Sequence, residues 1–394
     1  MRNIFSFVIY FLGLICLLLY SYTQVDLGLV ITRVPWLYII EKKFQYIGYF
    51  NRPLSTLIFI LLVIFFTLSY VAILKLINAK KISPSIFWKI LGITAVVLIL
   101  CYNAFSYDLF NYIFDAKIVT HYQQNPYIHK ALDYPTDPML GFMHWTQRTY
   151  PYGPVWLGLT VPLSFIGFNY FLLTFYLFKL LIVGSYVGTV YFLYKILEKM
   201  RVDKPLYQLA LFAFNPLVLF EWGVSAHNDG VMFFFAIWAI YRLMDKKFSS
   251  AFILLLLSIG IKFATVFLLP LFIIVLLKRK EFGKIDWRNN FFITFLLMLI
   301  PLFFVIFRTN FQPWYLLYLL VFLPLIPTKK VLQIVTSVIA ILALGIYLSF
   351  LYTGSWHSPL FLLQSAVYYW LSVLSLIICV GFLLFKTKRL LIKA

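Results

Sequence analysis

The sequence predicts an all-α polytopic membrane protein with about twelve transmembrane helices and juxtamembrane helices on the outer face. Of its 394 residues, 63% are hydrophobic and only 12% are charged, whereas soluble domains carry about 25% charged residues. The apolar residues form long continuous runs, which become helices because backbone in lipid must satisfy its own hydrogen bonds. Alternating ten-residue segments, typical of outer-membrane barrels, are absent. A soluble enzyme, a secreted disulfide scaffold and a disordered protein are therefore excluded.

The predicted spans follow the apolar runs in chain order. The runs lie at residues 4–22, 54–77, 87–105, 169–194, 206–221, 230–244, 248–261, 263–277, 291–307, 313–328, 331–351 and 362–386. Several runs are shorter than the ~20 residues that one span needs. The pair at 248–277 can also be read as one long span plus a broken one. The whole chain, 1–394, is expected to form a single integral membrane domain.

The charge distribution predicts the orientation. The net charge is +20, and with both termini in the cytoplasm most Lys and Arg fall in the short inner loops, as the positive-inside rule requires. This explains the basic character without a nucleic-acid partner. The only long hydrophilic segments, 23–52 and 105–168, then fall outside. We therefore expect a multi-pass protein of the cytoplasmic (plasma) membrane, in contact with membrane lipids, with an extracytoplasmic active site.

The segment 105–168 is predicted to be more than a loop. Residues 107–120 have apolar side chains at helical spacing, whereas residues 122–150 are rich in Pro, His and Asp and are expected to be irregular. Residues 154–167 are apolar but short for a span, and a crossing there would move the basic patch at 195–204 to the outer side. We therefore expect an interfacial or half-buried helix at 154–167.

The first candidate for chemistry is Ser106-Tyr107-Asp108, where the third apolar run ends. An ionised carboxylate at a membrane boundary is costly unless water or a partner meets it, so Asp108 is a candidate general base. It is equally a candidate cap for the helix at 107–120.

The second candidate is His227-Asn228-Asp229, with Glu221 shortly before it. These polar groups at the start of a span can bind sugar hydroxyls, although Asp229 can also cap the following helix. One His with one nearby acid, and no second ligand at helical spacing, is not a metal motif.

Two cations interrupt apolar sequence far from the basic loops. Lys262 lies between two apolar runs, and Arg308 precedes Gln312, Pro313, Trp314 and Tyr315. Either cation suits an anionic lipid headgroup or a phosphate. The alternatives are a snorkelling Lys and an anchor Arg in an interfacial aromatic belt.

A loop dense in Pro and Gly runs from Asn125-Pro126-Tyr127 to Tyr150-Pro151-Tyr152-Gly153-Pro154, which fixes its shape. The spacing of His121, His129 and His144 matches no metal-ligand pattern. Glycine-rich phosphate loops and the common hydrolase and metalloprotease motifs are also absent from the sequence. No cofactor and no metal are expected.

The order of these motifs resembles that of the C-type glycosyltransferases, polytopic enzymes that use polyprenol-phosphate sugars on the outer face. The resemblance is strongest to bacterial polyprenol-phosphate-mannose-dependent mannosyltransferases and looser to the GPI mannosyltransferases. It covers approximately residues 87–330. The matching pieces are Ser106-Tyr107-Asp108, Tyr112, Asn125-Pro126-Tyr127, Trp145, Tyr150-Pro151-Tyr152-Gly153-Pro154, Asn215-Pro216-Leu217-Val218-Leu219, His227-Asn228-Asp229, Ile261-Lys262, Arg308 and Gln312-Pro313-Trp314-Tyr315.

The resemblance implies an activity and a role for each group. A hexose, mannose by family likeness, would move from a polyprenol-phosphate donor to a lipid-linked or cell-envelope glycan acceptor. Asp108 matches the catalytic base. The implied donor-phosphate residues are Lys262, Arg308, Gln312 and Tyr315, and the implied cavity residues are His227, Asn228, Asp229, Tyr150 and Tyr152.

One base acting directly implies inversion at the anomeric carbon, whereas retention would need a second carboxylate such as Asp229 or Asp115. A secondary transporter also fits many spans with intramembrane charges, although the charges here gather at the outer boundary. A lipid-linked glycan polymerase or ligase would also have its active site on the outer face of the membrane, and it would use an oligosaccharide-diphosphate donor.

Overall fold

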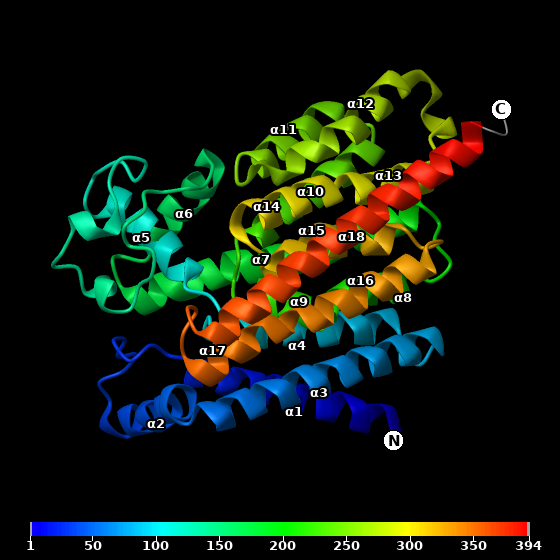
Figure 1. The fold of residues 1–394 in the computed structure, drawn as a ribbon. Helices are drawn as coiled ribbons and strands as arrows, with labels where there is room; N and C mark the ends of the chain where they lie inside the picture. Colours follow the sequence, from blue (N-terminus) through cyan, green and yellow to red (C-terminus); the bar gives the residue numbers. More distant parts are fainter. Residues whose placement is uncertain (1, 392–394) are drawn as a thin grey trace.

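The computed structural model describes the backbone of residues 2–391 and the side chains of residues 7–375. Within this part of the chain all regular secondary structure is helical, which confirms the all-α part of the prediction (Figure 1). The one pairing of strand type is an isolated bridge between Lys130 and Thr149.

The N-terminal helices form one side of the bundle. They are α1 (Arg2–Thr23), the short α2 (Pro35–Gln45) continued by a π-helical turn (Tyr46–Phe50), α3 (Arg52–Asn78) and α4 (Pro84–Leu100). On α3 a buried stripe includes Phe59, Phe66 and Tyr70, whereas Leu61 and Leu68 are exposed apolar side chains. Exposed leucines on a long helix have no partner in water, so this face is suited to lipid.

The predicted polar segment follows α4. It contains α5 (Asp108–Thr120), two 3-10 turns (Ala131–Asp133 and Pro138–Gly141) and α6 (Pro154–Ile166). The helix predicted at 107–120 is therefore present as α5, and the segment at 154–167 is a helix of only 13 residues. Figure 1 shows α5 and α6 together beyond the end of the bundle, with α7 (Phe171–Lys199) leading back into it.

The run predicted as one span at 206–221 is broken. The helix α8 (Pro205–Ala213) ends before Asn215, whose side chain caps α9 (Pro216–Val218) by accepting from Leu217 N at 3.0 Å. A π-helix (Leu219–Val224) follows. The cause is local, because Pro216 lacks an N–H and Asn is a strong helix start. The chain then turns into α10 (Asp229–Met244) and α11 (Phe248–Ile259).

The C-terminal part is also more divided than the apolar runs predict. Residues 248–277 form α11 and a returning segment of 3-10 helix (Phe263–Leu268) and α12 (Leu269–Leu277). After a 3-10 turn (Arg279–Lys284), α13 (Trp287–Leu297) and α14 (Leu299–Thr309) meet at Met298. Pro301 explains that break, since its ring clashes with the carbonyl four residues earlier.

The run predicted as a span at 313–328 is three short pieces, a 3-10 turn (Pro313–Leu316), α15 (Leu317–Leu320) and a second 3-10 turn (Leu323–Leu325). Pro313 and Pro324 begin or interrupt these pieces. The chain ends with α16 (Lys330–Ala343), a 3-10 turn (Leu344–Ile346), α17 (Tyr347–Thr353) and α18 (Pro359–Leu391). The predicted run 362–386 lies within α18, although its side chains after residue 375 lie outside the described set.

Four helical stretches in the described residues are long and apolar enough to cross a membrane. They are Arg52–Asn78, Phe171–Lys199, Trp287–Thr309 and Lys330–Thr353. Several apolar helices are shorter, including Pro84–Leu100 and Phe248–Ile259. The protein is therefore a membrane protein, and the count of about twelve spans stays a prediction.

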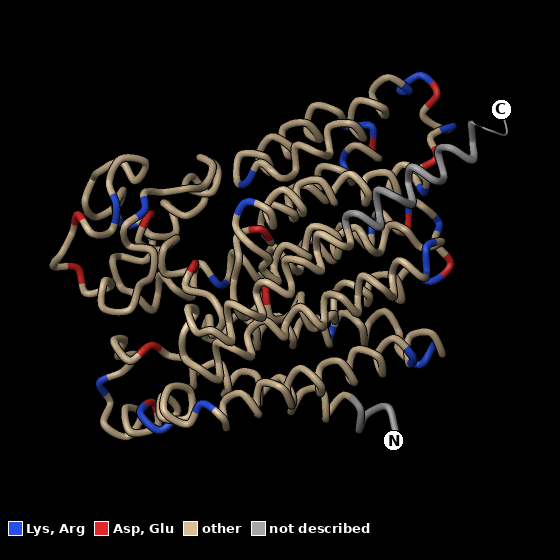
Figure 2. Tube along the Cα trace, viewed as in Figure 1, with Lys and Arg blue, Asp and Glu red and all other residues tan. Residues whose placement is uncertain are grey.

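The two ends of the bundle differ in charge. Helix α1 begins and α18 ends at the same end, where the α3–α4, α7–α8, α10–α11 and α12–α13 connections carry Lys and Arg (Figure 2). Both ends also carry Asp and Glu, but Lys and Arg clearly outnumber them at this end, whereas the two signs are nearly balanced at the opposite end, with α2, α5 and α6. This difference is the one on which the predicted orientation rests, and the orientation itself stays a prediction.

Candidate functional site

The predicted base and the predicted polar cluster meet at one place. Asp108 opens α5, and His227 and Asn228 precede α10. Asn228 N donates to Tyr112 Oη at 3.4 Å, and Tyr112 Oη donates to Asp108 Oδ2 at 3.4 Å. Two motifs that are far apart in the sequence are thus joined through one buried phenol, and this junction defines the candidate site.

Local chemistry explains why Asp108 starts a helix. Ser106 Oγ accepts from Asp108 N at 3.1 Å, which turns the chain out of the extended segment after α4. An acid in the first turn is also favourable beside the positive end of the helix dipole. The capping alternative and the functional alternative for Asp108 are therefore compatible, since its backbone starts the helix and its side chain reaches His227.

The turn that presents His227 is held by a buried lysine. Lys179 of α7 donates to the carbonyls of Gly223 and Val224, the last residues of the π-helix. Ala226 then takes a left-handed conformation with φ of 58°, which is uncommon for a residue other than Gly. Lys179 therefore satisfies backbone groups that the irregular helix leaves open, in the manner expected for π-bulges near functional sites.

His227 lies between two carboxylates. Its Nδ1 is 3.3 Å from Asp108 Oδ2, and its Nε2 is 3.3 Å from Glu221 Oε2. These are ion-pair distances, although neither ring nitrogen has an aligned hydrogen bond within the described residues. Tyr347 Oη donates to Glu221 Oε1 at 2.8 Å. Trp314, which is half-buried, stacks on the imidazole with a centroid separation of 4.2 Å, and His227, Glu221 and Tyr347 beneath it are buried.

The surrounding charges determine the protonation of Asp108 and His227. Burial works to raise the pKa of Asp108, but His227, Lys262 and Arg148 hold it below its ordinary value. Burial works to lower the pKa of His227, but Asp108 and Glu221 raise it to about 9. At neutral pH the site therefore holds an Asp108 carboxylate beside a His227 imidazolium. Arg148 Nη2 lies 3.7 Å from the other oxygen, Asp108 Oδ1.

Lys262 forms an ion pair with Asp229. Lys262 Nζ lies 2.6 Å from Asp229 Oδ2 and 5.4 Å from the centre of the Tyr152 ring. Asp229 is fully buried, whereas the Lys262 side chain is 20% exposed. Asp229 Oδ1 and the side-chain amide of Asn228 have no hydrogen bond within the described residues. Polar atoms that are buried and unpaired at a charged site are available to a ligand.

Gly153 explains how Tyr152 comes to lie beside Lys262. Gly153 N donates to Ile261 O at 3.1 Å, and Val155 N donates to Gly260 O at 3.0 Å. A Cβ at Gly153 would lie 2.1 Å from Gly260 O. Only Gly permits this close approach. It joins the loop before α6 to Gly260 and Ile261, the two residues before Lys262.

The remaining predicted site residues differ in their burial and in their contacts. Tyr150 is buried and its Oη donates to Gly153 O at 2.9 Å, so it shapes the loop. Arg308 is exposed at the end of α14 and forms no ion pair within the described residues. Tyr315 Oη shares a 2.8 Å hydrogen bond with Thr309. The segment of Gln312 borders the site through Trp314, and none of these contacts tests the donor-phosphate role.

Sequence reasoning missed several site residues. Glu221 had a usable signal, an acid within an apolar run six residues before His227, but was noted without a role. Arg148 and Tyr347 gave no such signal, because only the tertiary fold brings them to Asp108 and Glu221. Trp314 belongs to a motif that the sequence indicates, but its stacking on His227 is not predicted.

Comparison with known families decides the class of protein. Residues 10–278 match the MptA_B family, described as alpha-(1->6)-mannopyranosyltransferase, N-terminal domain. The chain belongs to this family. It is therefore a mannosyltransferase, which confirms the resemblance read from the sequence. No curated protein and no solved structure matches it.

The matched region of the mannosyltransferase contains Asp108, the 227–229 cluster and Lys262, and it ends before Arg308. The ion-pair array is thus largely built from the matched part. The stacking Trp314 and the hydrogen-bonding Tyr347 come from the part that follows.

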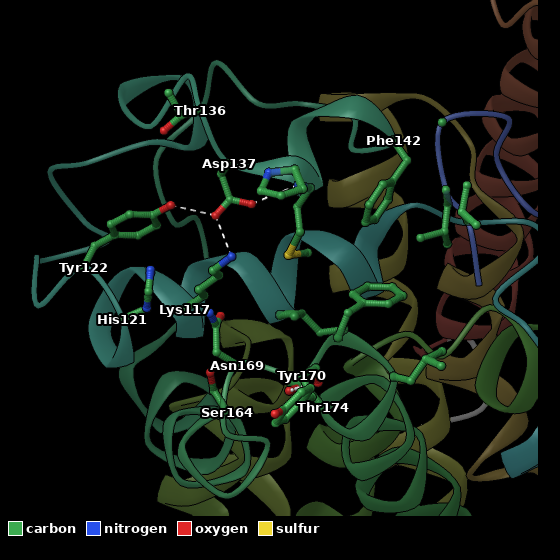
Figure 3. A pocket seen from close by; sticks show the side chains of 18 residues that line it. Lys117, His121, Tyr122, Thr136, Asp137, Phe142, Ser164, Asn169, Tyr170 and Thr174 are labelled. Carbon is green, nitrogen blue, oxygen red and sulfur yellow. Dashed lines mark hydrogen bonds and ion pairs between the residues drawn. The ribbon is translucent and has the colours of Figure 1, made fainter. Parts of the chain in front are cut away.

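A large pocket of the mannosyltransferase is separate from Asp108. It has a volume of about 770 Å³ and lies between α5, the loop after it, and the start of α7 (Figure 3). Lys117 Nζ lies 2.6 Å from Asp137 Oδ2, and Tyr122 Oη donates to the same oxygen at 2.7 Å. Burial works to raise the pKa of Asp137, but Lys117 and Tyr122 hold it below its ordinary value. The pocket therefore combines a neutralised ion pair with aromatic walls, a surface suited to sugars.

We expect the transfer activity of the mannosyltransferase to fall as the pH rises through about 9. His227 has a pKa raised above its ordinary value, so its charge is present at lower pH and is lost there. Its loss would leave Asp108 and Glu221 facing a neutral ring. A pH profile of kcat/KM would measure the fall, and the His227→Gln variant should lack it.

Asp115 is the control for this profile. Burial raises its pKa to about 7, against the effect of Arg148. The Asp115→Asn variant should therefore keep the fall near pH 9. A fall that persists in His227→Gln would assign it to another group.

Proposed function

We propose that the protein transfers mannose from a polyprenol-phosphate donor to a hydroxyl of a lipid-linked or cell-envelope glycan, with inversion. The observation that carries the proposal is the Asp108 carboxylate, held among His227, Arg148 and Lys262 within the matched mannosyltransferase region. A fixed carboxylate beside cations offers a base and a phosphate site in one place.

Asp108 would act on the acceptor. The attacking hydroxyl forms a bond to the anomeric carbon, and its proton passes to Asp108. The bond between that carbon and the phosphate oxygen breaks, and the phosphate keeps the electron pair. Tyr112 and His227 both touch Asp108 Oδ2, which leaves Oδ1 on the side of Arg148. Side chains that fix a carboxylate keep its reacting oxygen aimed at the substrate.

The leaving phosphate needs positive charge. Asp108, Glu221 and Asp229 are matched by His227, Lys262 and Arg148, so the paired cluster is neutral. We assign the additional cation to Arg308, which is exposed and has no ion pair within the described residues. Lys262 and Arg308 together would therefore hold the donor phosphate, with Gln312 and Tyr315 on the neighbouring segment.

The placement of Glu221 and Asp229 favours inversion, since neither is free. Glu221 is held by Tyr347 and His227, and Asp229 is held by Lys262. A retaining mechanism needs a second carboxylate free to attack the anomeric carbon. The acceptor would dock on the 105–168 segment, and the pocket bordered by Lys117 and Asp137 supports this.

A transfer assay tests the proposal. Purified protein should be given polyprenol-phosphate mannose, glucose and arabinofuranose separately, with a nucleotide-activated mannose as the control. We expect transfer from the polyprenol-phosphate mannose. Transfer from the nucleotide sugar alone, or uptake of a solute without transfer, would contradict it.

The proposed orientation is tested by cysteine labelling. In a background with all three cysteines replaced by Ser, cysteines at Asn125 and Lys280, both exposed positions, should react with a membrane-impermeant reagent from opposite sides. We expect Asn125→Cys to label in intact cells and Lys280→Cys only after the membrane is opened. Labelling of both positions from one side would overturn the orientation.

A further inference from the structure

A second pocket lies at the basic end of the bundle, between α3, α8 and α16. Its volume is about 480 Å³. Its lining includes three lysines, Lys75, Lys204 and Lys330, each from a different part of the chain, and no acidic residue. None of the three forms an ion pair with a described residue, and Lys204 Nζ donates to Asn78 Oδ1 at 2.7 Å. The pocket therefore holds an uncompensated positive charge.

Two helix ends add to this charge. Helix α8 begins at Pro205, directly after Lys204, and α16 begins at Lys330. Neither helix has a side-chain cap, and neither has an acid in its first turn. Uncapped helix N-termini carry partial positive charge and free N–H groups, so they attract anions.

The floor of the pocket is polar and buried. Gln333 Nε2 donates to Gln208 Oε1 at 2.6 Å and to Leu323 O at 3.0 Å. Gln208 Nε2 makes no hydrogen bond to another described residue and can donate into the pocket. Lysine ammonium and amide N–H₂ groups are the donors that phosphate oxygens accept.

The walls extend into an apolar surface. On α3, Leu68 and Val71 share a face with Lys75, and both side chains are exposed. On α16, Ile334 and Val338 share a face with Lys330 and are also exposed. These residues lead from the charged pocket along the two helices in the direction of the opposite end of the bundle. A lipid whose headgroup lies in the pocket would thus place its acyl chains against these apolar side chains.

We propose that this pocket binds the phosphate of an anionic phospholipid. The three lysines and the two helix N-termini select the charge, and the apolar faces of α3 and α16 select a lipid over a free anion. The site is remote from Asp108 and does not depend on the identity of the donor or the acceptor.

Binding can be measured on the full-length protein in detergent. Phosphatidylglycerol should raise Tm in a concentration-dependent way, and phosphatidylcholine with the same acyl chains should not. In the Lys75→Gln/Lys204→Gln/Lys330→Gln variant, the affinity for phosphatidylglycerol should fall at least about tenfold. The matched control is Lys278→Gln/Lys280→Gln/Lys284→Gln, which removes three exposed lysines of the same end outside the pocket and should bind normally.

Three outcomes would overturn the proposal. Equal stabilisation by both lipids would indicate apolar lipid contact without headgroup recognition. Competition by inorganic phosphate as strong as that of the lipid would indicate a free-anion site. Equal losses in the two triple variants would indicate general surface charge. If the pocket variant does not fold, the three single Gln variants replace it and should each bind phosphatidylglycerol more weakly, whereas the Lys→Arg triple keeps the charge and should bind normally. Unchanged binding in all the single variants would also contradict the site.

Discussion

The Asp108→Asn variant should lower kcat/KM for mannosyl transfer by about 10²- to 10⁴-fold. The amide is nearly isosteric and keeps the contact with Tyr112, but it cannot accept the proton of the acceptor hydroxyl. The effect should fall on kcat, because Asp108 is proposed to act on the reacting proton and not on the donor phosphate. Transfer from polyprenol-phosphate mannose by purified protein is the measurement.

The control is Asp133→Asn, which removes an exposed acid from the same polar segment. It should leave transfer unchanged. A Tm close to that of the wild type would show that Asp108→Asn is folded, although loss of one charge beside His227 should lower Tm somewhat. Near-normal turnover of folded Asp108→Asn would move the base to Asp115 or Asp229.

The sequence indicates which short polar motifs belong to the candidate site, but it does not predict how they meet or where the helices break. The motifs around Asp108 and His227 are short polar stretches within apolar sequence. Burying a charge in apolar surroundings is energetically unfavourable, so such residues usually have a functional role. Their meeting through Tyr112 depends on the turn at Ala226 and on Lys179, which no local pattern predicts. Lys179 is visible in the sequence only as a charge within a span.

The apolar runs at 206–221 and 313–328 show why the helix boundaries failed. Hydropathy measures the preference for lipid or core, and it does not distinguish a continuous helix from short helical pieces packed inside the bundle. Asn215-Pro216 and the prolines at 313 and 324 mark these breaks, and they carry more information about them than hydropathy does. Residues 217–224 are fully buried and do not face lipid.

The Lys262→Ala variant should weaken the use of donor and also destabilise the protein, for two separate reasons. A charge-assisted hydrogen bond to the donor phosphate contributes about 1.5–3 kcal/mol. Its loss should therefore lower kcat/KM for the donor by about 10- to 100-fold, mainly through a higher KM. The second effect arises because Asp229 is fully buried and would lose its partner at 2.6 Å, and an unpaired buried charge is strongly unfavourable.

A double variant separates the two effects. Lys262→Met keeps the length of the side chain, and Asp229→Asn removes the charge left behind. The double variant should recover most of the Tm lost in Lys262→Met, while the donor KM stays high. If donor use recovers together with Tm, Lys262 serves only to pair with Asp229.

Arg308→Ala provides the matching test without the stability effect. Arg308 is exposed and has no ion pair within the described residues, so its removal should leave Tm unchanged. The donor KM should nevertheless rise by about 10-fold or more, because the paired cluster is neutral and Arg308 supplies the additional positive charge. A snorkelling Lys262 and an anchoring Arg308 predict the reverse, with small effects on stability in detergent and unchanged donor kinetics. Unchanged donor KM in both Lys262→Met/Asp229→Asn and Arg308→Ala would remove the phosphate site from this region.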